Sequence, residues 1–330
     1  MAENTTKPQK NRARSWWKIV TEVVGNWNQH GAAAQSAALA FYTLFSLAPV
    51  LVVVIAMAGA VFGREAVRGQ IVAEFSGLMG RDAAELVQEV IRSAARPSSG
   101  RIATALGIVT LIFGASGVFV QLQEALNRVW DVAPKPGAVF TTLLRKRLLS
   151  FSLVLGIGFL LMVSLILSAA LSAVGRLLER LAAPVWVFEG TNFLVSFLAV
   201  TLVFALIYRV LPDVHLAWRD VATGALLTAL LFVVGKTLIG IYLGRTGMAS
   251  AYGAAGSLVV VLLWVYYSAL VFFFGAELTR ILSRSHRSGK AKPEEGAMRV
   301  PPELAGATAP SAEDMKRLAN VPEPAQKGIA

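Results

Sequence analysis

The sequence contains no cysteine, which excludes both a disulfide framework and a thiolate metal site. It has only three histidines, His30, His215 and His286, and they stand far apart without the spacing of metal ligands. Charged residues make up only 15% of the chain, whereas 55% of its residues are hydrophobic. We therefore expect no metal and no cofactor, and we expect a membrane protein rather than a soluble one.

Long uncharged segments are the main feature of what the chain does contain. The segment 35–62 carries no charged residue and exceeds the roughly 20 apolar residues that cross a hydrocarbon core of about 30 Å. Because these segments are continuously apolar and do not alternate, they predict an all-α polytopic membrane protein rather than a β-barrel. The six predicted transmembrane helices are residues 35–62, 102–120, 148–174, 192–211, 221–243 and 256–282.

The segments beside the spans are polar or amphipathic. Residues 1–14 are basic, and we expect them to be disordered. Between Trp16 and Trp27 apolar residues recur at helical spacing, which predicts an amphipathic helix that either lies in the membrane interface or packs as an ordinary helix. Residues 63–101 predict two further amphipathic interfacial helices that break near residues 77–80.

The distribution of charge predicts how the membrane domain, residues 15–285, is oriented. Lys and Arg are more numerous beside the spans on the side of the two termini, which predicts cytoplasmic N and C termini. Residues 286–330 are charged and rich in proline, and we expect a disordered cytoplasmic tail. We attribute the net charge of +11 to basic segments that face anionic lipid headgroups, and not to nucleic-acid binding.

Three stretches carry motifs, which read AALAFYTLFSLAPVL (Ala37–Leu51), QEALNRVWDV (Gln123–Val132) and YGAAGSLVVVLLWVYYSALVFFFGAELTR (Tyr252–Arg280). In order and spacing they resemble the signatures of the YihY/BrkB family of bacterial inner-membrane proteins. The resemblance covers roughly residues 15–285. It implies a six-helix inner-membrane protein with both termini in the cytoplasm. It also implies a link to serum resistance and a proposed movement of solutes or ions, while the family's older label, ribonuclease BN, is treated as a misassignment.

Several hydrophilic residues inside the predicted spans are candidate substrate or gating residues. Tyr42, Ser46 and Pro49 would share one face of the first span, where Pro49 frees a backbone carbonyl, so this face is either a structural kink or the lining of a polar cavity. Lys236 either snorkels to the headgroups, makes a structural hydrogen bond, or binds an anion or a lipid phosphate. Trp264 is either a core residue or a platform for a substrate.

Charged residues near the expected cytoplasmic face are candidate ion pairs. Glu124 and Arg128 are spaced four residues apart with the acid first, which favours a pair within one helix. Glu277 lies about one turn before Arg280 in the last span. It either forms a structural pair at this face, with Arg280, Arg128 or the basic cluster 145–147, or acts as a proton- or cation-coupling carboxylate.

Together these features predict a protein that moves or handles a small solute, ion or lipid through a cavity among the first, second, fifth and sixth spans. The alternative is a membrane scaffold or an envelope-assembly factor that transports nothing. We expect no enzyme activity, because metal-assisted cleavage needs a cluster of carboxylates or histidines that the sequence does not offer. The expected partners are the lipid bilayer and its anionic headgroups, and a homo-oligomer is possible in either case.

Overall fold

The computed structural model of the chain describes residues 9–94, 117–134, 185–246, 255–285, 292–293 and 297–300. The helices are α1 (Gln9–Gln29), α2 (Ala32–Phe62), α3 (Arg64–Met79), α4 (Arg81–Ala94), α7 (Val185–Val210), α8 (Trp218–Thr246) and α10 (Gly256–Ser285). Residues 117–129 are also helical. The strands are β1 (Val132–Pro134), β2 (Val214–His215), β3 (Lys292–Pro293) and β4 (Ala297–Arg299). The fold is therefore all-α apart from these short strands, as the sequence predicts.

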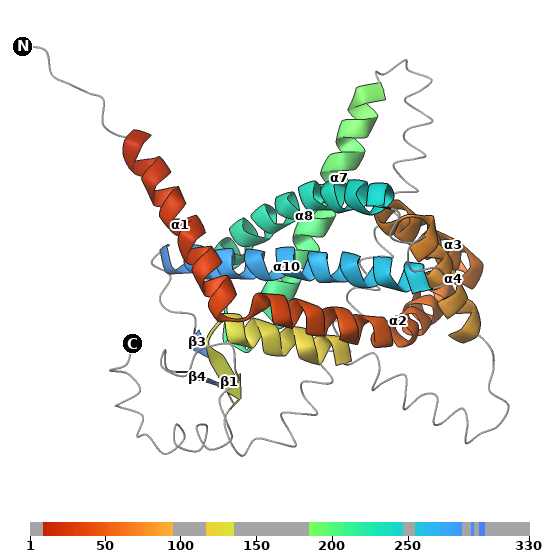
Figure 1. Cartoon of the computed structure of the whole chain (residues 1–330), viewed down its shortest axis with the longest axis horizontal. Coiled ribbons are helices and arrows are strands. Elements are labelled where there is room, and N and C mark those ends of the chain that lie inside the picture. Colours follow the sequence, from red (N-terminus) through yellow and green to blue (C-terminus); the bar gives the residue numbers. More distant parts are fainter. Residues whose placement is uncertain are drawn as a thin grey trace, which may run out of the picture.

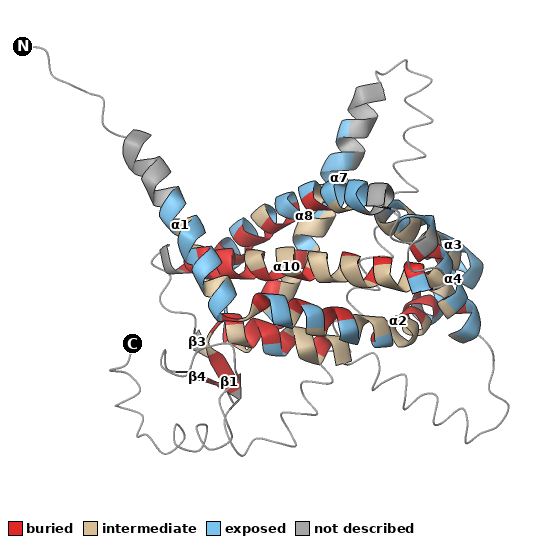
Figure 2. Ribbon diagram, viewed as in Figure 1, coloured by how far each residue is buried: buried red, intermediate tan, exposed pale blue. Residues whose placement is uncertain are grey.

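Helix α10 is the centre of the bundle and packs against α1, α2, α4 and α8. Figure 1 shows α2, α10 and the yellow helix 117–129 side by side, with α1 leaving one end of the bundle and α3 and α4 covering the other end. Buried residues follow the inner faces of these helices, whereas α1 is largely exposed (Figure 2). The largest core cluster joins α2, helix 117–129, α7, α8 and α10.

Three of the described helices are long and apolar enough to cross a membrane, namely Ala32–Ala60, Trp218–Tyr242 and Gly256–Ser283. They coincide with the first, fifth and sixth predicted spans. The apolar part of α7, Ser196–Val210, is shorter but falls within the fourth predicted span. The third span and most of the second lie outside the described residues, so the number of six spans stays a prediction.

Two glycines with positive φ separate α2, α3 and α4. Gly63 has φ +86° and Gly80 has φ +90°, a region that side chains with a Cβ rarely adopt. The amide of each glycine still donates to a carbonyl of the preceding helix, from Gly63 to Gly59 and from Gly80 to Ser76, both over 3.0 Å. The predicted break near residues 77–80 is thereby confirmed at Gly80.

Parts of both terminal segments take regular structure. Helix α1 begins at Gln9, and lysine, arginine and alanine in its first residues are good helix formers; the expected disorder of residues 1–14 stays a prediction. In the tail, β3 pairs with β2 and β4 pairs with β1, both antiparallel. The backbone groups of residues 292–293 and 297–299 are thus satisfied by pairing with short loop strands, and disorder of the tail as a whole stays a prediction.

Helices α8 and α10 pack through reciprocal glycine–threonine contacts. Gly224 of α8 lies against Thr279 of α10, and Gly275 of α10 lies against Thr228 of α8, so closely that a methyl group on either glycine would overlap the threonine side chain. Thr228 donates to the Gly224 carbonyl over 2.8 Å, and Thr279 donates to the Gly275 carbonyl over 2.7 Å. The hydroxyls are thus satisfied within their own helices, and the contact between the helices rests on close packing.

We expect Gly275→Ala to destabilise the protein by about 1–3 kcal/mol, because the added methyl group overpacks the contact with Thr228. Thermal unfolding in detergent, followed by near-UV circular dichroism, measures the effect. Gly240→Ala is the matched control in α8, since nothing lies within 4 Å of the position of its added methyl group. Equal stability of the two variants would contradict this packing.

A buried charge cluster at one end of the bundle

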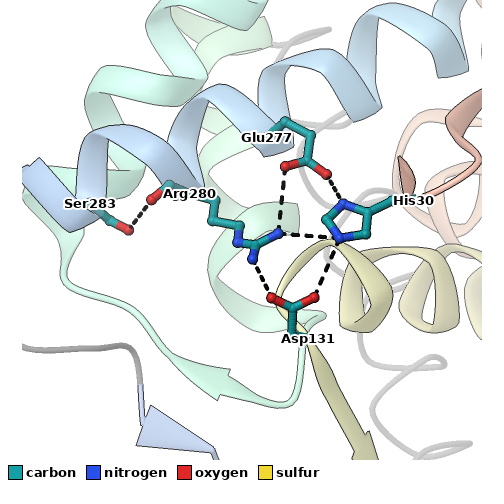
Figure 3. A network of polar contacts seen from close by, with 5 residues as sticks. All are labelled: His30, Asp131, Glu277, Arg280 and Ser283. Carbon is teal, nitrogen blue, oxygen red and sulfur yellow. Dashed lines mark hydrogen bonds and ion pairs between the residues drawn. The ribbon is translucent and has the colours of Figure 1, made fainter. Parts of the chain in front are cut away.

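Four charged or titratable side chains meet where α1 turns into α2. His30 lies in the turn between these helices, and Asp131 follows helix 117–129. Glu277 and Arg280 stand one turn apart on α10, so their side chains share one face of this helix. Figure 3 shows the four side chains pointing toward one another. We call His30, Asp131, Glu277 and Arg280 the charge cluster.

The charge cluster is a closed arrangement of two carboxylates and two basic groups. His30 Nδ1 contacts Glu277 Oε1, and His30 Nε2 lies 3.3 Å from Asp131 Oδ1. Arg280 contacts Asp131 Oδ2 through Nη2, and its Nη1 lies 3.8 Å from Glu277 Oε2. Each acid therefore faces both bases (Figure 3).

Burial makes the balance of charge in this cluster matter. The residues His30, Glu277 and Arg280 have exposed fractions of only 6%, 0% and 7%. An uncompensated charge at such a depth is costly, because the low dielectric strengthens every electrostatic term. With His30 protonated, two positive charges balance the two negative ones, and the cluster is neutral as a unit.

The protonation state of His30 decides how its Nε2 atom is bonded. This nitrogen lies 3.3 Å from Asp131 Oδ1 and 3.4 Å from Arg280 Nη1. A protonated ring donates from both nitrogens, to Glu277 and to Asp131. A neutral ring that keeps its proton on Nδ1 can only accept at Nε2, which favours Arg280 over Asp131. The loss of one proton would thus exchange one hydrogen bond for another within the charge cluster.

The surroundings of His30 favour the protonated form. Burial by itself lowers the pKa of His30, but the hydrogen bonds to Asp131 and Glu277, together with the charge of Glu277, outweigh burial and the repulsion from Arg280. The net result is a pKa raised from 6.5 to about 9. His30 is therefore charged at neutral pH in the folded protein.

Asp131 occupies an unusual backbone conformation. Its φ of +50° is the only positive value of a residue other than glycine among the described parts of the chain. It follows the end of helix 117–129, a position that glycine usually takes, and the conformation costs roughly 1 kcal/mol for other residues. Its carbonyl accepts a hydrogen bond from the Val300 amide over 2.8 Å, which links the charge cluster to the tail strands. The carboxylate, by its ion pairs, offsets the backbone strain.

A second polar group positions helix 117–129 and thereby Asp131. Gln123 and Asn127 donate to the two carboxylate oxygens of Asp213 over 2.9 and 2.7 Å, and the Asp213 amide donates back to Asn127 over 2.8 Å. Asp213 belongs to the loop after α7, so these bonds join this loop to the helix. On α10, Ser283 donates to the backbone carbonyl of Arg280 over 2.7 Å.

The candidate ion-pair residues are placed only in part as predicted. Glu277 does face Arg280, one of the partners considered for it. Glu124 is exposed and Arg128 is half-buried, and the charge cluster contains neither of them. The basic cluster 145–147 lies outside the described residues.

The other candidate residues do not converge on a single site. Tyr42 is exposed and Ser46 is buried, and both lie near Gly117 of the neighbouring helix. Helix α2 continues through Pro49, which is half-buried. Trp264 is buried and packs edge-to-face on Phe232 with 5.9 Å between the ring centroids, as the core alternative predicts.

Lys236 is far from the charge cluster and exposed. It lies on α8, and Gly240, four residues further on the same side of the helix, is also exposed. Its neighbour Gly235 packs on Tyr267, which is about 15 Å along α10 from Glu277 at 1.5 Å per residue. This placement fits the snorkelling alternative, in which the stem lies along lipid.

Two members of the charge cluster, His30 and Asp131, were not candidates from the sequence. Asp131 stands inside the motif QEALNRVWDV, which is a usable signal. His30 precedes the first span without any recognisable pattern. Only the fold brings it to Glu277, which is 247 residues away in the sequence.

These observations define an all-α integral membrane protein with a buried charge cluster at one end of its bundle. The profile of the family described as Virulence factor BrkB matches residues 23–299, and the chain belongs to this family. The match includes all members of the charge cluster.

Named relatives agree with this assignment. A "UPF0761 membrane protein" of Chromohalobacter salexigens is 28% identical over 282 residues, covering 83% of this chain and 66% of the relative. A protein of the same name from Alcanivorax borkumensis is 28% identical, covering 85% and 64%. The chain thus spans about two thirds of the length of these relatives. The "Putative ribonuclease-like protein YfkH" of Bacillus subtilis is 24% identical, covering 81% and 95%. No solved structure matches the chain.

We expect the stability of the protein to fall as the pH rises from 6.5 to 9. Since folding raises the pKa of His30, the stabilisation is complete below pH 6.5 and is lost as the pH passes about 9, by up to about 3 kcal/mol. Thermal unfolding in detergent at a series of pH values measures this slope. His30→Gln, which cannot titrate, should be less stable and should lack this part of the slope; an unchanged slope would contradict the assignment.

Substitution of Asp131 separates the stability that its carboxylate contributes from the stability that its strained backbone costs. Asp131→Gly relieves the positive φ and yet should destabilise the protein by on the order of 3 kcal/mol, because it removes the carboxylate that contacts Arg280 Nη2 and leaves two buried basic groups to share Glu277. Asp131→Asn, which tolerates the same backbone, should also lose stability. Chemical unfolding of both variants provides the measurement. A glycine variant more stable than the wild type would show that the ion pair contributes less than the backbone strain costs.

Proposed function

We propose that the protein moves or handles a small solute, ion or lipid in the bacterial inner membrane, with both termini in the cytoplasm. We further propose that the charge cluster is its proton-responsive latch. The observation that carries the proposal is the position of His30 Nε2 between Asp131 Oδ1 and Arg280 Nη1. Gain or loss of a proton there changes which of the two it bonds.

The latch would act on the contacts between separate parts of the bundle. His30 belongs to the turn before α2, Asp131 to the end of helix 117–129, and Glu277 to α10. Protonated, the ring holds all three together; neutral, it loses its bond to Asp131. Binding or release of a proton at His30 would therefore alter how helix 117–129 lies against α10. Coupling of a proton to transport requires such a change.

The alternative of a scaffold without transport activity is supported by a different observation. The residues first considered for a cavity lie apart: Lys236 is on the outer surface, and Trp264 is in the core. In a scaffold the charge cluster would be a static clamp whose groups never exchange partners. The transport proposal requires the contacts within the charge cluster, including those of Glu277, to change, whereas the scaffold proposal requires them to stay fixed.

We propose no nuclease activity for this chain, although one relative is named as ribonuclease-like. The carboxylates of Asp131 and Glu277 already face Arg280 and His30. Within the described residues, no group of three or more His, Asp or Glu side chains is arranged to hold a metal ion. Metal-assisted cleavage of a phosphodiester would need such a set.

Reconstituted vesicles test the transport proposal. Proteoliposomes that contain a pH-sensitive dye would be exposed to a panel of inorganic anions, monovalent cations and small organic acids, and a fluorescent phospholipid would report lipid movement. We expect the wild type to respond to one member of the panel and Glu277→Gln to lose this response, because the amide cannot form the charged pair with His30.

Glu85→Gln is the matched control, since Glu85 is an exposed carboxylate on α4, away from the charge cluster. It should respond as the wild type does, and all variants should reach the same level in the vesicles. A wild type without response to any member of the panel, or a Glu277→Gln variant with full activity, would refute the proposal and favour the scaffold.

A further inference from the structure

Helix α1 has a second apolar face that the bundle does not cover. Val23 is buried and, with Ile19, packs against Leu278 and Ile281 of α10. Beside this packed face, Trp17, Val20 and Val24 have exposed fractions of 71%, 41% and 49%. Their spacing of three and four residues places them on one face of the helix. The apolar residues of α1 thus form two neighbouring faces, one packed against α10 and one exposed.

The opposite side of α1 is polar. Lys18, Glu22 and Gln29 are exposed there, about a third of a turn or more from the apolar face. Figure 2 shows that α1 leaves the bundle with most of its described surface exposed. The helix therefore has the arrangement of a segment that lies between an apolar phase and water.

The contacts of α1 place it at the membrane boundary. Its packed face meets Leu278 and Ile281, and the apolar segment of α10 that can cross a membrane ends at Ser283. Val23 is thus level with the last turns of a span. A helix that leaves the bundle at this level has its apolar face at the junction of headgroups and acyl chains.

The charge of α1 indicates which kind of surface it fits. Its sequence contains Lys10, Arg12, Arg14 and Lys18 against a single acid, Glu22. Each basic residue near an anionic membrane surface contributes about 1 kcal/mol. A zwitterionic membrane would attract only the apolar face of α1, whereas an anionic membrane would also attract its positive charge.

We propose that α1 binds the surface of an anionic lipid bilayer through Trp17, Val20 and Val24, and that the positive charge of its sequence adds attraction to the lipid phosphates. This contact is separate from the transport proposal, because it needs no movement of the charge cluster. It gives the turn at His30 a fixed position at the membrane surface, since α1 ends at Gln29.

The absence of cysteine makes the test direct, because a single introduced cysteine can be labelled without background. Val20→Cys and Val24→Cys would carry an environment-sensitive fluorophore in nanodiscs of phosphatidylcholine with or without phosphatidylglycerol. Gln29→Cys, exposed on the polar side, is the matched control. Quenching by spin-labelled lipid and by aqueous iodide reports where each label lies.

We expect lipid quenching at positions 20 and 24, iodide quenching at position 29, and stronger lipid quenching in anionic nanodiscs that weakens at high salt. A triple variant, Lys10→Gln with Arg12→Gln and Arg14→Gln, removes three positive charges and should lose the preference for anionic lipid. Circular dichroism should show that its fold is unchanged. Iodide quenching at positions 20 and 24 would overturn the proposal. Protection that depends on protein concentration and not on lipid would assign the face to a second copy, and would also overturn it.

Discussion

The compensation of one buried carboxylate governs the end of the bundle where the α1–α2 turn, helix 117–129 and α10 meet. Glu277 is fully buried on the central helix, and its charge must be balanced by groups that come from other parts of the chain. His30 and Arg280 provide this balance, and Asp131 balances them in turn. A charge at this depth therefore dictates where the α1–α2 turn and the end of helix 117–129 can lie.

Other features of the structure bring these groups within reach. The Gly224–Thr279 and Gly275–Thr228 contacts set α10 directly against α8. The two residues that α10 contributes, Gly275 and Thr279, stand on either side of Glu277 in the sequence. Asp213 holds helix 117–129 through Gln123 and Asn127, and the Val300 amide holds the backbone of Asp131. Packing, hydrogen bonding and strand pairing thus all help to position the groups that balance the buried charge of Glu277. The protonation of His30 then becomes a natural point of control, because it decides whether His30 Nε2 donates to Asp131 or accepts from Arg280.

Much of the fold could be predicted from the sequence because a bilayer imposes a simple rule on composition. Continuous apolar segments indicated α2, α8 and α10, and glycine indicated the break between α3 and α4. The short pairings of the tail with β1 and β2 could not be predicted, since low apolar content says nothing about pairing with a distant strand. In the site, Glu277 and Arg280 could be found as charges beside a span, but His30 could not, because no local pattern marks it.

The sequence by itself determined the class of protein, the positions of the apolar helices and the presence of charges at their ends, because these depend on the transfer of each residue from water to lipid. Only the tertiary structure decided which charges meet, that Lys236 faces outward while Trp264 faces the core, and that half of the apolar face of α1 stays uncovered. These outcomes depend on how helices rotate and cross, which is set by contacts between residues hundreds of positions apart.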